Sequence, residues 1–433
     1  MSSKNIIIFS ILILVLVGIS NTTIINFDPN AAAYFEEDII VKNRRLACDS
    51  NEMVNLNGTF LSEIPRGFIK SSTVKAITLS NNKITRIPHD AFDDVPNLEC
   101  LDLSYNKISI LDLLDIRHDH LKILIFDHQE ALEWDNFLQN NIPFYTSNPN
   151  FPNVEVLSLK RIGYEHSSLY ANLFPKLSTI YWEDNQVAYV TPNITDYFSP
   201  NLKVIHLERN NLKRFITNDL QNVEELYLDE NPLEYLSIDV SSNLKILSLM
   251  DCNIEFDWKL YFPTLITLDL SRNKLQEINA EYNATPNLEN LSLNYNRFTT
   301  FPRLEHFSQL RKLSLNYNSI KTINFVTTSL LKTLHLRGNE ITHVDYSAFV
   351  NVPNLEELDL AENKLNSLPY NWGSPLKMLR YINLSSNRFK SIAHIDSSSC
   401  INLNHIFVKN NYFRTISKDE IKYIPDNCTV YVA

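Results

Sequence analysis

Glycine is scarce in this sequence. The chain has 433 residues and six glycines, where average usage of about 7% would give roughly thirty. They stand apart from one another, at Gly18, Gly58, Gly67, Gly163, Gly338 and Gly373. Dinucleotide fingerprints, phosphate-binding loops and the Gly-x-Ser-x-Gly elbow all need closely spaced glycines. The spacing therefore excludes nucleotide enzymes of the glycine-loop kind and serine hydrolases of the elbow kind.

Positive charge is also in deficit. Lysine and arginine total 39 against 50 aspartates and glutamates, for a formal net charge of −11. Such a chain has no excess of cations to neutralise a phosphate backbone, so we expect no nucleic-acid partner. Hydrophobic residues make up 44% of the chain, which is enough for a buried core and excludes wholesale disorder.

Long apolar runs are absent after the first twenty residues. Ile6 to Val17 is apolar, Lys4 precedes it, and Gly18-Ile19-Ser20 offers small residues for cleavage. The run is shorter than the ~20 residues that span a bilayer, so residues 1–20 are predicted to be a signal peptide. We expect a secreted, extracellular protein with no stable membrane insertion.

Asn-x-Ser/Thr sequons agree with that compartment. Besides Asn21 they comprise Asn57, Asn193, Asn283, Asn290, Asn383 and Asn427, which we predict as glycosylation sites. The polar segment 21–47 contains Lys42-Asn43-Arg44-Arg45. This tetrapeptide resembles a furin-type processing site; the alternative, which we favour, is a solvated charge cluster.

A repeat organises the rest of the chain. From Val74 onward the pattern Leu-x-x-Leu-x-Leu-x-x-Asn-x-Leu recurs about fifteen times, and a degenerate copy precedes it near Val54 and Leu56. Copies open at Val74, Leu98, Leu121, Val154, Leu177, Leu202, Val223, Leu244, Leu265, Leu288, Leu310, Leu331, Leu355, Leu379 and Leu403. The alternating leucines predict a short strand in each copy, and the asparagine predicts a ladder of side-chain amides between stacked copies.

This pattern is identified as the leucine-rich repeat. It predicts an α/β solenoid, a horseshoe with a concave parallel β-sheet. We divide the chain into a signal peptide (1–20), a polar pre-repeat segment (21–47), a degenerate N-terminal cap repeat (48–73), the repeats (74–425) and a C-terminal cap end (426–433).

The second half of some copies carries a further signature. Ile87 to Asn97 reads Ile-Pro-His-Asp-Ala-Phe-Asp-Asp-Val-Pro-Asn, and Val344 to Asn354 repeats it. It resembles the extracellular repeats of Toll-receptor ectodomains, chaoptin and the mosquito leucine-rich immune proteins. The chain shows no transmembrane helix, signalling domain or coiled coil, so the resemblance implies a secreted relative without these parts, plausible in innate immunity.

Two breaks and five cysteines depart from the regular pattern. The ladder position holds Gln129 and Ile162 in the copies that flank a 33-residue step, and Cys252 in a later copy. The extra residues around Trp134 are apolar at helical spacing. They predict either a specialised insertion near a binding site or, as we favour, a helix on the outer face. Cys252 is predicted to be a buried, reduced thiol.

The other cysteines suggest bridges in an oxidising compartment. Cys400 and Cys428 lie about one repeat apart, and a bond between them would seal the last coil. Resemblance to extracellular family members implies a four-cysteine N-terminal cap before a Leu-x-x-Ile-Pro motif. Leu61 to Pro65 matches that motif, but Cys48 alone remains. Cys48 and Cys100 pair if the cap folds back; alternatively, one of them links a partner chain.

The sequence carries no recognisable catalytic or metal-binding pattern. His118, His120 and His128 are close in sequence but lack the spacing of a metal site, and we read them as solvated. We predict no cofactor and no enzymatic activity. A secreted enzyme is the least favoured function, behind a recognition module and an adhesion, guidance or matrix protein.

The concave sheet is the predicted binding surface. Outward strand positions on adjacent copies carry aromatic and acidic residues that suit a protein partner with a basic surface, although such positions also simply tolerate these types. The candidate ligand-binding residues are Tyr181, Glu183, His206, Glu208, Tyr227 and Asp229, together with the apolar Ile123, Ile125 and Val156. Sugars on Asn290 and Asn383 would leave this half of the sheet open.

Overall fold

The computed structural model describes residues 24–26, 39–40, 46–130, 151–163, 173–190, 199–218, 220–238, 243–255, 262–278, 285–426 and 428–432. Two compact units divide the chain: an N-terminal unit of residues 38–296, and a C-terminal unit of residues 297–433 with residues 1–37. The predicted signal peptide, Arg45 and its basic neighbours, the insertion around Trp134, Asn193, Asn283 and Asn427 lie outside the described residues.

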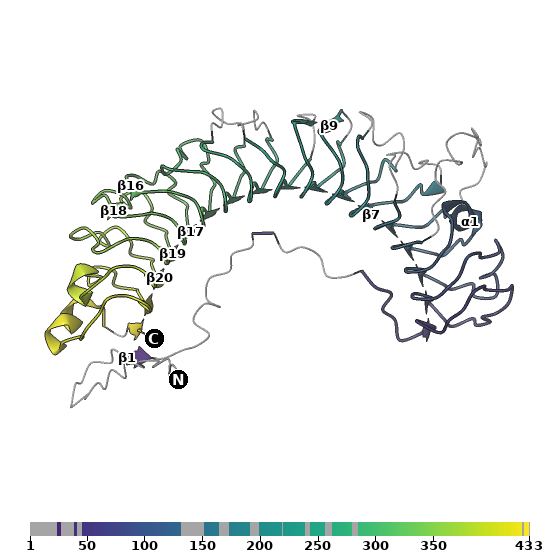
Figure 1. Ribbon diagram of the computed structural model, residues 1–433, viewed down its shortest axis with the longest axis horizontal. Coiled ribbons are helices and arrows are strands. Elements are labelled where there is room, and N and C mark those ends of the chain that lie inside the picture. The colour runs from purple at the N-terminus through teal and green to yellow at the C-terminus, as the bar shows by residue number, and fades with distance from the viewer. Residues whose placement is uncertain are drawn as a thin grey trace, which may run out of the picture. The chain divides into compact units, whose positions relative to one another are not determined.

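Each coil contributes one three-residue strand, because its alternating leucines point to one side. In the N-terminal unit (Figure 1) the strands are β2 (Met53–Asn55), β3 (Ala76–Thr78), β4 (Cys100–Asp102), β5 (Ile123–Ile125), β6 (Val156–Ser158), β7 (Thr179–Tyr181), β8 (Val204–His206), β10 (Glu225–Tyr227), β12 (Ile246–Ser248), β13 (Thr267–Asp269) and β14 (Asn290–Ser292). In the C-terminal unit they are β15 (Lys312–Ser314), β17 (Thr333–His335), β19 (Glu357–Asp359), β20 (Tyr381–Asn383), β21 (His405–Phe407) and β22 (Thr429–Tyr431).

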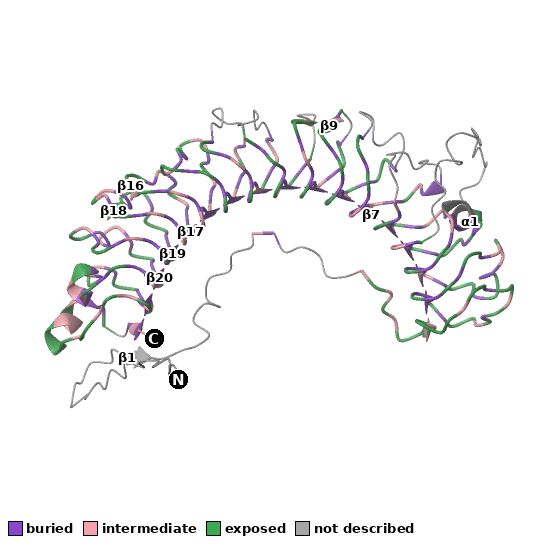
Figure 2. Cartoon of the chain, viewed as in Figure 1, coloured by how far each residue is buried: buried purple, intermediate pink, exposed green. Residues whose placement is uncertain are grey.

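The strands pair in parallel with no offset between coils. Tyr181 stands opposite His206, and His206 opposite Tyr227. From β3 onward the middle residue of each of these strands, such as Leu101 or Leu247, is buried in the leucine core (Figure 2). The predicted parallel-sheet solenoid is therefore confirmed. We call the strand side opposite the core the open face.

An asparagine ladder joins the coils, as predicted. Asn210 Nδ2 donates to the carbonyl oxygens of Trp182 in the preceding coil (2.9 Å) and Leu207 in its own coil (3.0 Å). Its Oδ1 accepts from the Val187 amide at 3.1 Å. Each buried amide thus satisfies backbone groups that no strand partner reaches.

One predicted break in the ladder is wrong. Gln129 Oε1 accepts from the Ile108 amide at 3.1 Å, and its Nε2 donates to the Leu103 carbonyl at 3.0 Å. Glutamine carries the same amide on a longer stem, so it performs the asparagine's role. Ile162 is a true break, since its side chain is fully buried and apolar.

The residue before the ladder position adopts a left-handed conformation in coil after coil, with φ of 53° at Asn81 and 54° at Glu362. Glycine occupies this position at Gly338, with φ of 69°. A Cβ there would lie 2.3 Å from the Tyr317 ring. Close approach of that ring, rather than the backbone conformation by itself, explains the glycine.

The opposite side of the coils carries loops and short elements. These are α1 (Ile110–Asp115), the paired strands β9 (Arg214–Thr217) and β11 (Tyr235–Ile238), the paired strands β16 (Thr322–Ile323) and β18 (His343–Val344), and the 3₁₀ turns η4 (Ile392–His394) and η5 (Lys418–Tyr423). Ser109 caps α1 by accepting from the Asp112 amide. Within the described ranges no helix is both long and apolar enough to cross a membrane.

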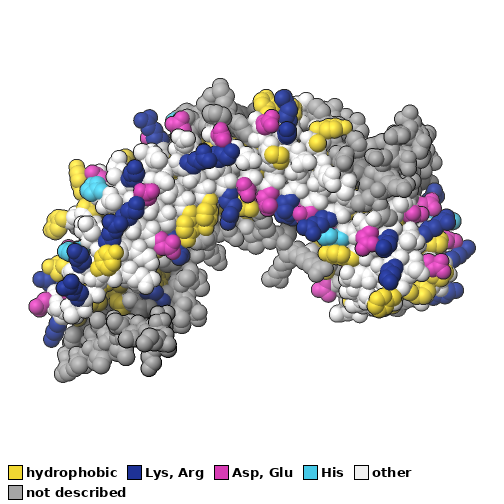
Figure 3. Space-filling view, viewed as in Figure 1, with side chains coloured by type: hydrophobic (Ala, Val, Ile, Leu, Met, Phe, Trp, Pro, Cys, Tyr) yellow, Lys and Arg dark blue, Asp and Glu magenta, His cyan; other side chains and the backbone are white. Residues whose placement is uncertain are grey.

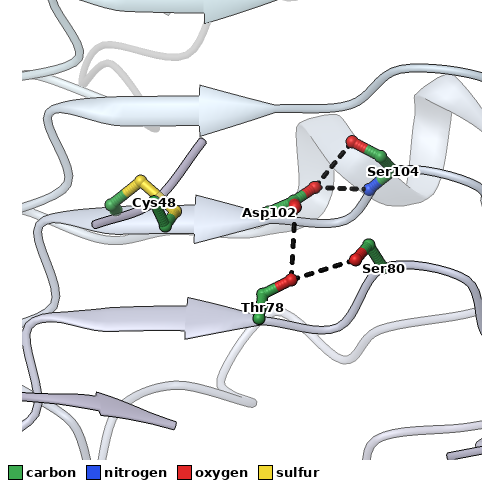
Figure 4. Close-up of a disulfide and its surroundings, with 6 residues drawn as sticks. Cys48, Thr78, Ser80, Asp102 and Ser104 are labelled. Carbon is green, nitrogen blue, oxygen red and sulfur yellow. Dashed lines mark hydrogen bonds between the residues drawn. A yellow bond between two sulfur atoms is a disulfide. The ribbon is translucent and has the colours of Figure 1, made fainter. Parts of the chain in front are cut away.

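A disulfide joins Cys48 to Cys100 across 52 residues of sequence. The bond attaches the segment 46–50 to the open face of β4 (Figure 4). Of the two alternatives predicted for these cysteines, a bond to each other or a bond to a partner chain, the structure shows the first. Both sulfurs are used within the chain, so neither is left to link a partner chain.

The predicted bond between Cys400 and Cys428 is wrong for this structure, in which both thiols are buried and unbonded. Cys400 Sγ points back at Gly373, where an added Cβ would lie 2.2 Å from it. The sulfur thus fills the space that glycine leaves in the preceding coil. Cys252 is a buried free thiol, as predicted, and burial raises its pKa to about 12.

A short strand from the start of the chain completes the C-terminal unit. β1 (Ile24–Asn26) pairs in parallel with β22, with Ile25 opposite Val430. β22 itself lies in the segment that the sequence marks only as the C-terminal cap end.

Candidate functional site

Three rings stack on the open face at the centre of the predicted surface. The centroids of Tyr181 and His206 are 4.5 Å apart, and those of His206 and Tyr227 are 4.4 Å apart, with interplanar angles of 14° and 3°. The unshifted parallel register produces this stack, because it sets equivalent side chains on neighbouring strands side by side.

The stack changes the predicted role of these residues. Tyr181 is 8% exposed and Tyr227 3%, so neither stands free as an anchor for a partner. The Tyr227 hydroxyl donates to Glu225 Oε2 at 2.8 Å, and burial raises its pKa. Each ring is covered by its neighbours, so these outward strand residues contribute to packing on the open face.

In the coils of β6, β7 and β8 a charged residue lies two positions after the last residue of the strand. Lys160 Nζ lies 3.0 Å from Glu183 Oε1 and 4.6 Å from the Tyr181 ring centre. Burial, followed by repulsion from Glu208, raises the pKa of Glu183. Glu208 Oε1 lies 3.0 Å from His206 Nδ1.

Asp229 has a different role from the one predicted. Its Oδ1 accepts from Ser248 Oγ at 2.6 Å and from the Met250 amide at 2.7 Å, and the residue is fully buried. It therefore joins two coils and is not available to steer a basic partner.

Glu183, His206 and Glu208 form one buried cluster. Each offers a nitrogen or oxygen atom, and these atoms lie within 4.8 Å of one another. This donor set could hold a metal ion, which the sequence analysis did not foresee. Two features of the sequence could have revealed the cluster. His206 and Glu208 are two residues apart, and the repeat register places Glu183 of the preceding coil beside them.

The predicted apolar residues lie on the neighbouring strands. Ile123 stands opposite Val156, and Val156 opposite Thr179. Ile123 and Val156 are half-buried, whereas Ile125 is 2% exposed. Val204, the first residue of β8, is also half-buried and continues this row. The structure thus collects all nine candidate residues on one face, with the first strand positions the most accessible.

A polar hollow of about 400 Å³ adjoins this row. Its walls come from the disulfide-held segment 46–48 and from coils β2 to β6, including Asp102, Tyr105, Asp127, His128 and Lys160. Repeat periodicity does not reveal this hollow, because one wall is the cap segment folded back across the sheet.

Hydrogen bonds hold the acids of the hollow in place. Asp102 Oδ1 accepts from Ser104 Oγ at 2.6 Å, and its Oδ2 accepts from Thr78 Oγ1 at 3.2 Å (Figure 4). Asp127 Oδ1 accepts from Ser158 Oγ at 2.6 Å and from the Lys160 amide at 2.9 Å. Burial raises the pKa of Asp127.

Tyr105 is the accessible aromatic residue at the hollow. It is 41% exposed, and its ring stacks on His128 with centroids 4.2 Å apart. It occupies the left-handed position before the ladder asparagine, with φ of 55°, which directs it away from the leucine core. The sequence analysis missed it because only strand positions were considered.

The predicted solvated histidines differ from one another. His118 is buried, its Nε2 lies 3.0 Å from the Val95 carbonyl oxygen, and burial lowers its pKa. The solvated reading is therefore wrong for His118, which packs between two coils. His120 is exposed, and His128 belongs to the hollow.

The described sequons differ in accessibility. Asn57 is exposed, whereas Asn383 is only 7% exposed and its Oδ1 accepts from the Ser385 amide at 3.1 Å. Asn290 is half-buried and donates to Thr267 Oγ1 at 3.1 Å. A glycan needs an accessible amide, which Asn383 does not offer in this structure.

Ion pairs between coils cover the sides of the solenoid, and the space-filling view shows both signs of charge interspersed (Figure 3). Arg209 binds Asp184 with two hydrogen bonds, of 2.7 Å and 2.9 Å. Partial burial by itself would raise the pKa of Asp184, but the hydrogen bonds and positive charge of Arg209 outweigh it and lower the pKa. These pairs bind neighbouring coils to each other and present no single-sign patch.

Comparisons with known proteins agree with this architecture. The family model described as leucine rich repeat matches residues 52–108, 72–126 and 329–389. Mouse podocan-like protein 1 is 25% identical over 70% of this chain, which covers 55% of that protein. Mouse keratocan is 26% identical over 65% of the chain, which covers 76% of keratocan. The chain thus spans about half of the first relative.

A solved structure extends the comparison to the fold. A chain from the Drosophila Toll–Spatzle complex superposes with a TM-score of 0.57 at 20% identity, over 80% of this chain and 48% of that one. At this identity the likeness concerns the solenoid itself.

Proposed function

We propose that this leucine-rich-repeat protein is an extracellular recognition module that binds a protein partner at the hollow and along the adjoining row Ile123, Val156, Thr179 and Val204. The observation that carries the proposal is the continuity of the two features. Ile125 of β5 and Lys160, two residues after β6, line the hollow, and the same two strands supply Ile123 and Val156 to the row.

The chemistry of the hollow favours a basic side chain from the partner. Two carboxylates, Asp102 and Asp127, line it, and Tyr105 offers an aromatic face at its edge. A lysine or arginine that enters there would gain both an ion pair and a cation–π contact. The half-buried aliphatic row supplies apolar contact area beside it, which is the usual composition of an interface core.

The buried residues of the predicted site support this surface instead of touching the partner. The Tyr181–His206–Tyr227 stack holds β7, β8 and β10 in register, so the row above it is rigid before binding. Rigid surfaces lose less conformational entropy on association.

The relatives support a role outside the cell without naming the partner. The Toll structure is a complex with Spatzle, so this fold accommodates a protein ligand. A part in innate immunity is our first choice, and an adhesion, guidance or matrix role is the alternative. We propose no catalytic activity for this face. Expression after microbial challenge, compared with expression in developing tissue, distinguishes the two roles.

The binding surface is tested by capture from the native body fluid. Wild-type protein, Tyr105→Ala and Val156→Glu serve as baits, and retained proteins are identified by mass spectrometry. We expect one protein retained by the wild type and lost with both variants. Tyr370→Ala and Val350→Glu alter exposed residues of the C-terminal unit and should retain it. Equal retention by all five baits would place the binding site elsewhere.

A further inference from the structure

The cluster of Glu183, His206 and Glu208 contains three buried polar atoms with no hydrogen-bond partner. They are Glu183 Oε2, His206 Nε2 and Glu208 Oε2. The residues are 6%, 3% and 5% exposed, respectively. An unpaired buried polar group costs about 1–3 kcal/mol, and more when it is charged. One ligand atom from each of these residues also lies within 4.8 Å of the others, so a single ion bound between them can satisfy polar atoms of the cluster.

The remaining atoms of the cluster are already oriented. Glu183 Oε1 faces the Lys160 ammonium, and Glu208 Oε1 faces His206 Nδ1, each at 3.0 Å. The rings of Tyr181 and Tyr227 on either side fix the imidazole plane.

Charge also favours a cation. Two carboxylates and one ammonium meet here, so the cluster has an excess of negative charge when both acids are ionised. Calcium and magnesium prefer oxygen ligands throughout, whereas an imidazole combined with carboxylates suits zinc and its first-row neighbours.

We propose that Glu183, His206 and Glu208 bind one divalent transition-metal ion, of the zinc class, on the open face of β7 and β8. The ion would join two neighbouring coils and stabilise the rigid stack beside the proposed binding row. The inference does not depend on a partner protein, since all three side chains belong to this chain.

A shared proton is the competing explanation. Burial and Glu208 together raise the pKa of Glu183, and a proton between the two carboxylates would also satisfy oxygen atoms. Such a proton joins only the two carboxylates, whereas an ion can contact a ligand atom from all three residues, which is why we favour the metal.

The test uses the full secreted chain, stripped with chelator and then titrated with Zn²⁺ at pH 7 by isothermal calorimetry. We expect saturable binding of one ion per chain and a rise in melting temperature. Glu183→Gln and His206→Gln should weaken Zn²⁺ affinity by about tenfold or more. Co²⁺ provides a second readout, because its visible spectrum should change on binding to the wild type and not to His206→Gln.

His335→Gln is the matched control. His335 is also buried, and its Nε2 lies 2.7 Å from Glu357 Oε1, but it belongs to the C-terminal unit. This variant should bind Zn²⁺ as the wild type does. Absence of saturable binding to the wild type would overturn the proposal whatever the variants do. Unchanged affinity in folded Glu183→Gln and His206→Gln would overturn it as well.

Discussion

Lys160 and Glu183 form an ion pair of 3.0 Å between adjacent coils, in which the side chain of the acid is 7% exposed and that of the lysine 25%. The same ammonium lies over the Tyr181 ring. One cation therefore pairs with one oxygen of a buried carboxylate and covers the end of the aromatic stack.

Replacing Lys160 with methionine should destabilise the N-terminal unit by about 2 kcal/mol at pH 7. Losing one partner of a buried pair costs about 3–5 kcal/mol, and the partial exposure of Lys160 reduces that figure. Adding Glu183→Gln to Lys160→Met should restore part of the loss. Thermal unfolding of the wild type, both single variants and the double variant measures the coupling. Additive effects in that cycle would show that the two side chains do not interact.

Asp359 should make stability fall as the pH rises from 4 to 7. Burial raises its pKa to about 6, above the ordinary value of about 4. The folded chain therefore holds this proton more tightly than the unfolded chain, so the stabilisation is complete below pH 4 and is lost through pH 6. Asp359→Asn should reduce the change in the free energy of unfolding between pH 4 and pH 7 by up to about 3 kcal/mol.

Asp345→Asn is the control for the pH measurement. Hydrogen bonds from Ser347 lower the pKa of Asp345, so its contribution has the opposite sign and is lost as the pH falls. Chemical denaturation at half-unit steps from pH 4.5 to 7.5 compares the three proteins. A wild-type slope that Asp359→Asn leaves unchanged would assign the dependence to other groups.

Peptide mapping without reduction should recover Cys48 linked to Cys100. Cys400 and Cys428 are buried, so they should react with iodoacetamide only after unfolding. Cys48→Ala with Cys100→Ala should destabilise the first coils by about 2–4 kcal/mol, because the bond restricts the unfolded chain. Cys252→Ala, which removes a buried unbonded thiol, controls for the loss of sulfur. Recovery of linked Cys400 and Cys428 peptides would contradict the structure.

Gly338→Ala should destabilise the C-terminal unit more than Gly58→Ala destabilises the cap. Both glycines have φ near 68°, so both variants carry the same conformational cost. An added Cβ clashes with Tyr317 at Gly338 but meets nothing within 4 Å at Gly58. The difference should be about 1–3 kcal/mol, the usual cost of overpacking. Equal melting temperatures for the two variants would mean that the Tyr317 ring moves aside freely.

Repeat spacing predicts the structural features that recur from coil to coil. The copy that opens at Leu98 places its strand at residues 100–102, and Asn210 bonds the neighbouring coils as its position in the motif requires. The pattern and its stacking follow from local periodicity, so a single sequence is sufficient to derive them.

Burial on the open face could not be predicted in the same way. Whether Tyr181 is exposed depends on what the neighbouring coils present, here His206 and Lys160, and not on its own copy. The hollow depends on a segment outside the repeats, which the Cys48–Cys100 bond holds in place. The cluster of Glu183, His206 and Glu208 shares the first difficulty, because its members come from two coils and only the unshifted register joins them.

The pairing of β1 with β22 protects the end of the array. A terminal strand in a solenoid exposes a row of backbone donors and acceptors, to which another molecule could add its own strand. Here the edge beyond β22 is taken by Ile24–Asn26 of the same chain. Residues 24–26 therefore occupy the edge of β22 to which a strand of a second molecule could otherwise add.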